Sequence, residues 1–525
     1  MSSEARKGIL RVLSNYGRLI TTLVMGLFVV RILLQAVGDD AFGLIAFMGS
    51  TVGLTAMLRD IVNRSLVREL GEAIRTDRFP TVLNSALGLM LVLGLISLGL
   101  FGILIWALRF FDKIPPDMMF ACRVFVLTKG LETFFTLFLS PYFNSYLITE
   151  RMVAYNLWRI ADRSSVFLAA IALLVMNIHD PADGIMLYGA LTTALVLLVQ
   201  LASAIGMVSL DRRYIPRPSL TSLQEMIAIC RVGGWNAAQV AATSAHARID
   251  GLLMFLWMGP LGGRLFGIAF QLTSYIRQTA VGMTQGLDAV ATRMSVTAEQ
   301  EQINRLTDYS TRFNAAVVLP TMAAMAVMAT ALIEVWVRDR IGDPATEIPM
   351  IATLIRVFAV GIVARSIGDG WIAIFYGAGH IRRFAPAIVY SAIANPLIAV
   401  ALWFTLPDAV AYLAPAIAYA MTLLASNMVA VPLLAAEPFR IKPRQLFIPM
   451  TRPAIVTLLA LPILVIAELE ITTWNLRTLA VVGAGYGLAV LLLSWWIVLK
   501  TNERRRLLQG ITRRLLRRRA HSASS

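Results

Sequence analysis

The chain has 525 residues, of which 58% are hydrophobic and only 15% are charged. A soluble domain carries about 25% charged residues, so this composition excludes an ordinary water-soluble fold and indicates a membrane protein. The formal net charge of +16 would suggest a nucleic-acid partner in a soluble protein. Here the basic residues lie mostly between apolar runs and at the C-terminus, a placement that orients membrane helices.

Apolar runs follow one another along the chain, each near the roughly 20 residues that a helix needs to cross a bilayer. We predict helices, because an open strand cannot satisfy its backbone groups in lipid and the alternation of a barrel is absent. The first run lacks a cleavage site, so we expect it to be retained. About fourteen spans are predicted, in chain order Tyr16–Val37, Ala41–Ile61, Val82–Leu108, Met119–Leu147, Tyr155–Ile178, Gly184–Leu210, Gly234–Met258, Leu265–Ala291, Phe313–Val337, Ile351–Phe375, Phe384–Leu406, Val410–Leu434, Phe447–Leu469 and Leu479–Val498.

The connections between these spans alternate in charge. Roughly thirty Lys and Arg fall on the even-numbered side and about six on the other, where Gly38-Asp39-Asp40 and Leu406-Pro407-Asp408 carry none. The positive-inside rule therefore predicts that both termini are cytoplasmic. No outer connection exceeds roughly fifteen residues, which leaves no room for an external domain.

The C-terminal segment 501–525 combines arginine clusters with apolar residues at helical spacing, Leu507, Leu508 and Ile511 among them. We predict a basic amphipathic helix on the anionic cytoplasmic leaflet, with partner docking as the alternative.

Metal and cofactor motifs are absent from the sequence. The two cysteines, Cys122 and Cys230, do not form a disulfide framework, and the four histidines have no partner at ligand spacing. No Gly-rich phosphate loop occurs. We expect no cofactor, and a coupling ion, H⁺ or Na⁺, stays open.

A short internal repeat links the two halves of the chain. Residues 37–44 read Val-Gly-Asp-Asp-Ala-Phe-Gly-Leu, and residues 261–268 read Leu-Gly-Gly-Arg-Leu-Phe-Gly-Ile. Both copies lie at the outer turn between the first two helices of a block of six. Parallel repeats of this kind build transporters whose site lies at the repeat interface.

Polar side chains form stripes on several predicted spans, because residues three or four apart share a helix face. Stripes in lipid are costly, so we expect them to face one another or water. Their members are Thr51, Thr55, Arg59 and Asn63; Lys129, Glu132, Thr136 and Ser140; Asn236, Gln239, Thr243, His246 and Asp250; and Ser274, Gln278, Gln285 and Asp288.

Cations within the predicted spans are candidates for function, because an intramembrane charge costs about 2.5–3.5 kcal/mol on insertion scales. Arg18 and Arg277 are the leading ones, since neither has an obvious acid on its own helix. The alternatives are snorkelling, as for Arg31, or structural pairing, as for Lys129 with Glu132 and for Arg365 with Asp369. His246 is expected to be a satisfied interior histidine more readily than a proton relay.

The basic N-terminal helix with Asn15 and Arg18, the turn at 37–43 with its counterpart at 261–267, and the helix count resemble the bacterial polysaccharide exporters. These O-antigen and lipid-linked oligosaccharide flippases belong to the multidrug/oligosaccharidyl-lipid/polysaccharide superfamily, together with the lipid II flippase and the multidrug and toxin extrusion transporters. Phe42 departs from the family, which more commonly has Tyr there. The resemblance covers nearly the whole chain in architecture.

The resemblance implies an all-α polytopic fold: two six-helix lobes in a V around a central cavity, here 1–211 and 212–436, two further helices within 437–500, and the tail. It also implies that cavity arginines and lysines bind a substrate diphosphate. By placement these cations are Arg18, Arg59 and Arg277, followed by Arg31, Lys129, Arg248 and Arg365. The accompanying polar or coupling groups are Glu132, Asn236, Gln239, His246, Asp250, Gln278, Asp288 and Asp369.

The function expected from these features is a non-enzymatic flippase of the bacterial inner membrane for a polyprenyl-diphosphate-linked glycan, in O-antigen or lipopolysaccharide assembly beside other polysaccharide-assembly proteins. One alternative is a multidrug and toxin extrusion-type cation antiporter, which would want an acidic cavity. The first span argues against it, because it contains Arg18 and Arg31 and no interior acid. The other alternative, a membrane enzyme of polysaccharide assembly, lacks a sizeable outer loop.

Overall fold

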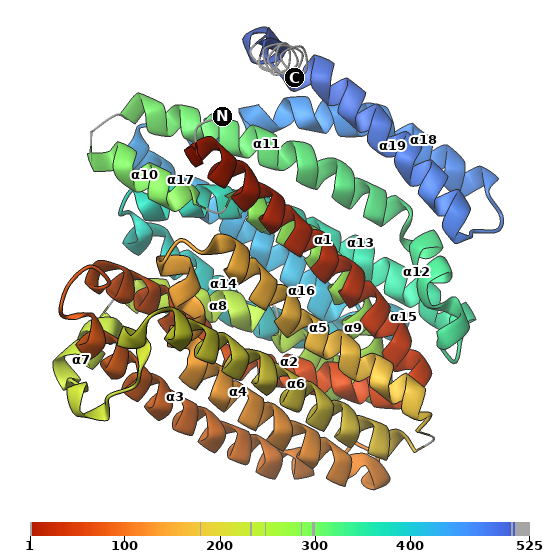
Figure 1. Ribbon diagram of the computed structural model, residues 1–525. Helices are drawn as coiled ribbons and strands as arrows, with labels where there is room; N and C mark the ends of the chain where they lie inside the picture. The colour runs from red at the N-terminus through yellow and green to blue at the C-terminus, as the bar shows by residue number, and fades with distance from the viewer. Residues whose placement is uncertain are drawn as a thin grey trace, which may run out of the picture. The chain divides into compact units, whose positions relative to one another are not determined.

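The computed structural model describes residues 3–505, except 179, 232–233, 247, 285 and 297–299, together with 508–509. Within these residues the chain is all-helical, as predicted (Figure 1). The α-helices are α1 Ser3–Val37, α2 Asp39–Ala73, α3 Phe79–Ala107, α4 Met119–Ile148, α5 Met152–Met176, α6 Pro181–Leu210, α7 Leu223–Arg231, α8 Gly234–His246, α9 Ile249–Thr284, α10 Leu287–Val296, α11 Gln300–Val327, α12 Ala329–Val337, α13 Pro344–Gly377, α14 Ile381–Thr405, α15 Asp408–Ala411, α16 Ala414–Leu423, α17 Val431–Ala436, α18 Thr451–Glu470 and α19 Leu476–Ile497.

The helices are long and apolar enough to make this a multi-pass membrane protein. Among the described residues nine helical stretches satisfy both length and hydropathy, or ten if α11 and α12, which meet at a bend of 70°, count as one span. The predicted spans are helical in the described residues, but some are interrupted: Leu265–Ala291 by the turn at Gly286, Phe313–Val337 by the bend between α11 and α12, and Val410–Leu434 by the break between α15 and α16. A stretch of 51 residues, Gly234–Thr284, carries the predicted seventh span and the eighth as far as Thr284. It breaks at Gly259, whose φ of 65° and ψ of −146° no helix contains, and Pro260 follows.

The chain forms two compact units, each assembled from separate stretches. Unit 1 comprises Met1–Tyr275, Trp336–Phe358 and Ile381–Ser426, and unit 2 comprises Ile276–Val335, Ala359–His380 and Asn427–Ser525. These units do not coincide with the predicted lobes 1–211 and 212–436, whose boundaries stay a prediction.

In unit 1, α4 packs between α3 and α6, while α1 packs along α5 (Figure 1). Small residues allow these helices to approach closely. A Cβ on Gly94 would lie 2.8 Å from the ring of Phe134, and one on Gly189 would lie 2.7 Å from the hydroxyl of Thr128. Close approach through small residues is what drives helix association in lipid, where the hydrophobic effect is absent. A second bundle in the same unit brings α14 against both α8 and α16.

The two copies of the internal repeat meet directly inside unit 1. A Cβ on Gly43 would lie 2.1 Å from the carbonyl oxygen of Pro260, and one on Gly263 would lie 2.3 Å from that of Gly43. The backbones of α2 and α9 therefore cross in contact. The turns differ in register, however: Gly38 makes the first turn with φ of 80°, whereas its counterpart Gly262 is helical and Gly259 makes the second turn.

In unit 2, α18 packs against both α11 and α19. Pro320 interrupts the hydrogen bonding of α11, and its carbonyl oxygen accepts a hydrogen bond from the hydroxyl of Tyr486 on α19 at 2.9 Å. The residues that follow α19 are fastened to α11 as well. Arg312, fully buried, donates to Glu503 and to the carbonyl oxygen of Val498. The predicted amphipathic tail lies outside the described residues from 510 onward.

Candidate functional site

Two arginines share one carboxylate in unit 2. Asp369 on α13 lies 2.9 Å from Nε of Arg365, one helical turn earlier, and 3.5 Å from Nη2 of Arg277 on α9. Arg365 is buried and Arg277 partly buried, and the Nε atom of Arg277 has no hydrogen-bond partner among the described residues. The expectation that Arg277 is left free for a ligand was wrong, because a different helix, α13, supplies an acid to it. The cluster still carries one more positive charge than negative.

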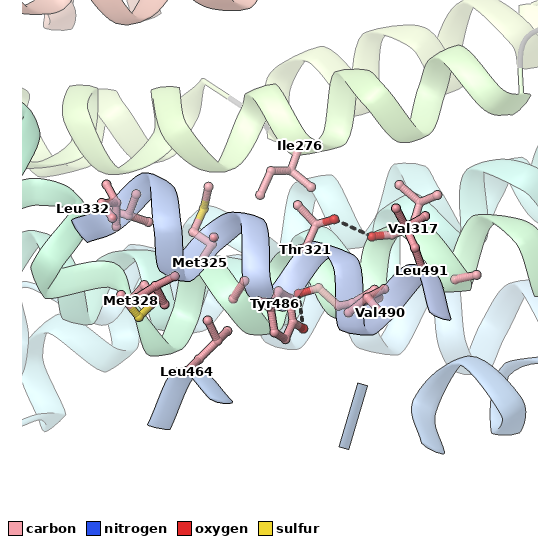
Figure 2. Close-up of a pocket in the computed structure, with 17 residues that line it drawn as sticks. Ile276, Val317, Thr321, Met325, Met328, Leu332, Leu464, Tyr486, Val490 and Leu491 are labelled. Atoms are coloured by element: carbon pink, nitrogen blue, oxygen red, sulfur yellow. Dashed lines mark hydrogen bonds between the residues drawn. The ribbon is translucent and has the colours of Figure 1, made fainter. Parts of the chain in front are cut away.

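Ile276, the residue before Arg277, lines an apolar groove. The groove has a volume of about 560 Å³ and is lined by side chains of α9, α11, α12, α18 and α19. Figure 2 shows Met325, Met328 and Leu332 along one side of the groove and Tyr486 and Val490 on α19. The two hydroxyl groups visible there are both satisfied, since Thr321 donates to the carbonyl of Val317 and Tyr486 to that of Pro320 (Figure 2). The groove therefore offers a hydrocarbon chain an almost purely apolar surface.

Arg18 is the predicted cation with the least compensation. It is half-buried on α1 near Tyr155 and Arg159 of α5, and no described residue forms an ion pair or hydrogen bond with it. Its Nε atom is fully buried without a partner. A guanidinium in this state is a donor prepared for an anion.

Lys129 is already neutralised. Its Nζ atom lies 2.6 Å from Glu132, one turn away on α4, and 2.8 Å from the hydroxyl of Thr192 on α6. Glu132 in turn accepts from Thr193 at 3.3 Å. This is the pairing weighed as the alternative, and it joins α4 to α6 inside the bundle.

The remaining predicted cations lie apart from these groups. Arg31 forms an ion pair of 2.8 Å with Asp339 and donates to the carbonyl of Trp336 at 2.9 Å. Arg248 donates to the carbonyl of Gly49 at 3.4 Å. The side chain of Arg59 lies outside the described residues.

The polar stripe on α8 faces protein. Asn236, Gln239 and His246 are all buried, and Nε2 of His246 is 2.8 Å from the hydroxyl of Thr422 on α16. These three side chains therefore do not face water, and that the stripe faces another stripe stays a prediction.

Asp250 continues this stripe onto α9. Its carboxylate is completely buried and accepts a hydrogen bond of 2.7 Å from Nδ2 of Asn395 on α14. Its second oxygen and the amide oxygen of Asn395 have no partner among the described residues. Two neighbouring buried oxygens that lack a donor can be satisfied by a proton or by a small cation. The last two predicted groups lie elsewhere: Gln278 is exposed on α9, and Asp288 lies in the first turn of α10.

Sequence reasoning missed an ion-pair network at the repeat turns, which we call the turn network: Asp39, Asp40, Arg264 and Glu347. Arg264 donates to Glu347 on α13 at 2.9 and 2.6 Å, with both side chains buried. Its third nitrogen lies 3.6 Å from Asp39 and 3.7 Å from Asp40. Asp39 also accepts from the backbone N–H of Gly342 at 2.5 Å. The repeat could have predicted this network, because Arg264 occupies the position in the second copy that Asp40 occupies in the first.

No known protein family matches this sequence, and no curated protein does. Solved structures, however, resemble its fold over most of its length. The lipid II flippase MurJ, in an inward closed conformation, aligns with a TM-score of 0.65 at 11% identity, over 93% of this chain and 98% of that one. The chain has the fold of MurJ and the MATE transporters.

Two further structures support this result. An inward-facing MATE family multidrug resistance transporter of the MOP superfamily has a TM-score of 0.62 at 14% identity, covering 82% of this chain and 98% of its own. A MOP superfamily transporter from Pyrococcus furiosus, described as having a binding pocket of reversed polarity that suggests a different function, has a TM-score of 0.58 at 15% identity and covers 82% and 95%. The predicted fold class is thereby confirmed.

Proposed function

We propose that this chain is a flippase that moves a lipid-linked, negatively charged saccharide, of the polyprenyl-diphosphate type, across the membrane by alternating access. One observation carries the proposal: in unit 2 the consecutive residues Arg277 and Ile276 belong to a cation-rich cluster and to the lining of an apolar groove. Successive side chains of a helix project about 100° apart, so the cluster and the groove occupy adjoining sectors of α9 at the same level. A molecule with a phosphate head and a long hydrocarbon tail matches this pair of surfaces, and a small organic cation does not.

The charges within the membrane-embedded helices favour the same substrate. Arg277 and Arg365 together outnumber Asp369, and Arg18 has no acid at all among the described residues. In a site of low dielectric constant, charge-assisted hydrogen bonds from arginine to phosphate are strong and often bidentate. Glycans of O-antigen or lipopolysaccharide assembly belong to this substrate class, and a cytoplasmic position of both termini fits the charge of the connections.

The test is transport in proteoliposomes of a fluorescent polyprenyl-diphosphate saccharide, followed by quenching of the outer leaflet. The double variant Arg18→Glu/Arg277→Glu should lower the initial rate at least tenfold, because it repels the phosphates. Arg212→Glu, in an exposed connection, is the matched charge reversal and should leave the rate unchanged. Equal rates in all three proteins would reject the proposal.

A cation exporter of the MATE type is the second candidate, and Asp250 is the observation that favours it. This buried acid has only the amide of Asn395 as a partner among the described residues. In the flippase, the same acid takes up the H⁺ or Na⁺ that drives the cycle. The two functions separate experimentally: Asp250→Asn should abolish ion dependence in either case, but only a cation exporter confers efflux of cationic dyes on intact cells.

A further inference from the structure

The N-terminal ends of α1 and α5 are fastened together by a buried amide. Nδ2 of Asn156 donates to the hydroxyl of Ser14 at 2.8 Å and to Oδ1 of Asn15 at 2.9 Å, and the side chain of Asn156 is almost completely buried. These bonds fix the register of the two helices. They consequently determine which side chains of the next turn meet, and those are Arg18 on α1 and Arg159 on α5.

Arg159 is held in one orientation by aromatic neighbours. Its Nε and Nη2 atoms donate to the hydroxyl of Tyr155 at 3.2 and 3.1 Å. Its guanidinium carbon lies 5.1 Å from the ring centre of Phe143 and 5.4 Å from that of Tyr155. Contacts with aromatic faces stabilise a cation without neutralising it. The remaining amino group of Arg159 is therefore free to bind an anion.

Arg18 and Arg159 form a pair of like charges. Arg18 is close enough to Arg159 for the two positive charges to act on each other, and Tyr155 lies nearby. The nearest acid along α5, Asp162, accepts a hydrogen bond of 3.2 Å from Gln200 on α6. Neither arginine has an ion pair with any described residue. Two half-buried guanidinium groups at the same level of packed helices repel when no carboxylate lies between them, and a shared anion converts that repulsion into attraction.

We propose that Arg18, Arg159 and Tyr155 form a loading site for the diphosphate head of a lipid-linked precursor, occupied before the head moves further into the protein. This inference rests on the proposed flippase function and adds a residue, Arg159, that the predicted set lacked. The charge of the connections predicts that this end of α1 and α5 faces the cytoplasm, where a lipid-linked precursor would be made. Two guanidinium groups match a diphosphate, because each can bind phosphate oxygens in a bidentate manner.

Arg163 extends the basic face of α5 by one further turn. Residues four apart share a helix face and differ by about 6 Å along the axis. Arg163 is exposed, and its charge acts on Tyr188 of α6 and on Tyr275 of α9. The loading site thus leads to a second cation on the same helix.

The experiment measures binding of farnesyl diphosphate to the purified full-length protein in phosphatidylcholine nanodiscs by calorimetry. Arg159→Gln should weaken binding at least tenfold, and Arg159→Lys should restore part of it. Arg109→Gln is the matched control, because Arg109 also lies over aromatic rings, 4.1 Å from that of Trp106, but is exposed at the other end of its bundle. The Arg109→Gln variant should bind farnesyl diphosphate as tightly as the wild type does. Thermal melting checks that each variant is folded.

The outcomes separate this inference from the function on which it rests. If the wild type binds farnesyl diphosphate and Arg159→Gln binds it equally well, the loading site is rejected and the flippase function stands. If the wild type does not bind it at all, both are rejected. Nanodiscs containing phosphatidylglycerol distinguish the source of the phosphate. If they abolish farnesyl diphosphate binding to the wild type, the arginines hold ordinary phospholipid heads and the loading site is again rejected.

Discussion

Asp369 illustrates how the environment of a membrane arginine depends on a helix that is distant in sequence. Arg277 has no acid within reach on α9, yet α13 presents Asp369 to it, almost a hundred residues later. The i,i+4 pairing of Arg365 with Asp369 was foreseeable from spacing alone. The participation of Arg277 was not foreseeable, because no local pattern specifies which face of α13 packs against α9.

An exposed ion pair outside the spans gives a prediction about pH. Arg78 donates to Glu225 at 2.7 and 2.6 Å, joining α3 to α7. The hydrogen bonds from Arg78 lower the pKa of the Glu225 carboxyl. A group whose pKa falls on folding stabilises the protein above its unfolded pKa, and this stabilisation disappears as the pH drops through the folded value.

The Glu225→Gln variant should therefore melt slightly below the wild type at neutral pH, by an amount corresponding to at most about 1 kcal/mol, since the pair is exposed to solvent. The difference should vanish at acidic pH, below the lowered pKa. Melting curves in detergent across a pH series measure it. A difference that is the same at every pH would contradict this account.

At the scale of helices, the crossing of α2 and α9 depends on the absence of side chains. Gly43→Ala places a methyl group against the carbonyl of Pro260, and a backbone cannot yield as a flexible side chain does. We expect a loss of about 1–3 kcal/mol or more. Gly49→Ala, two turns along the same helix, meets nothing within 4 Å and should be neutral or slightly stabilising. Denaturation of both variants in detergent tests the difference, and equal stabilities would contradict it.

The turn network gives a second prediction for the same crossing. Arg264→Met leaves the buried Glu347 without its cation and should cost about 3–5 kcal/mol. The double variant Arg264→Met/Glu347→Leu should recover most of this loss, because two apolar side chains need no partners. A double-mutant cycle on the melting temperature measures the coupling. Additive losses would indicate that the two residues act independently.

At the scale of the whole molecule, we predict that a large side chain placed in the groove of unit 2 slows transport. Gly483 lines the groove on α19, and no atom lies within 4 Å of the position that its Cβ would occupy. Gly483→Trp should fill the groove and slow transport of a long-chain prenyl lipid several-fold, while a short-chain analogue is less affected. Gly485→Trp, equally open but not part of the lining, is the control. If the transport rate depends neither on the length of the prenyl chain nor on the residue at position 483, the groove does not bind the substrate.

Much of the fold was predictable from the sequence, and less of the site. Long apolar runs determine where membrane helices lie, so the predicted spans are helical in the described residues, although breaks such as that at Gly286 were not foreseen. Which side chains meet depends on packing between distant helices, and for this reason the partner of His246, Thr422 on α16, was not predicted. Arg159 was overlooked because its importance arises from the register that Asn156 sets against α1.

The opposite charges at matched positions of the repeat have a consequence for the first half in isolation. Two copies of the first half would bring Asp40 against Asp40 at this turn, and the acids would repel. In the full chain, Arg264 lies 3.7 Å from Asp40 instead. An excised first half should therefore not self-associate through this surface, because the attraction exists only after the two copies have diverged.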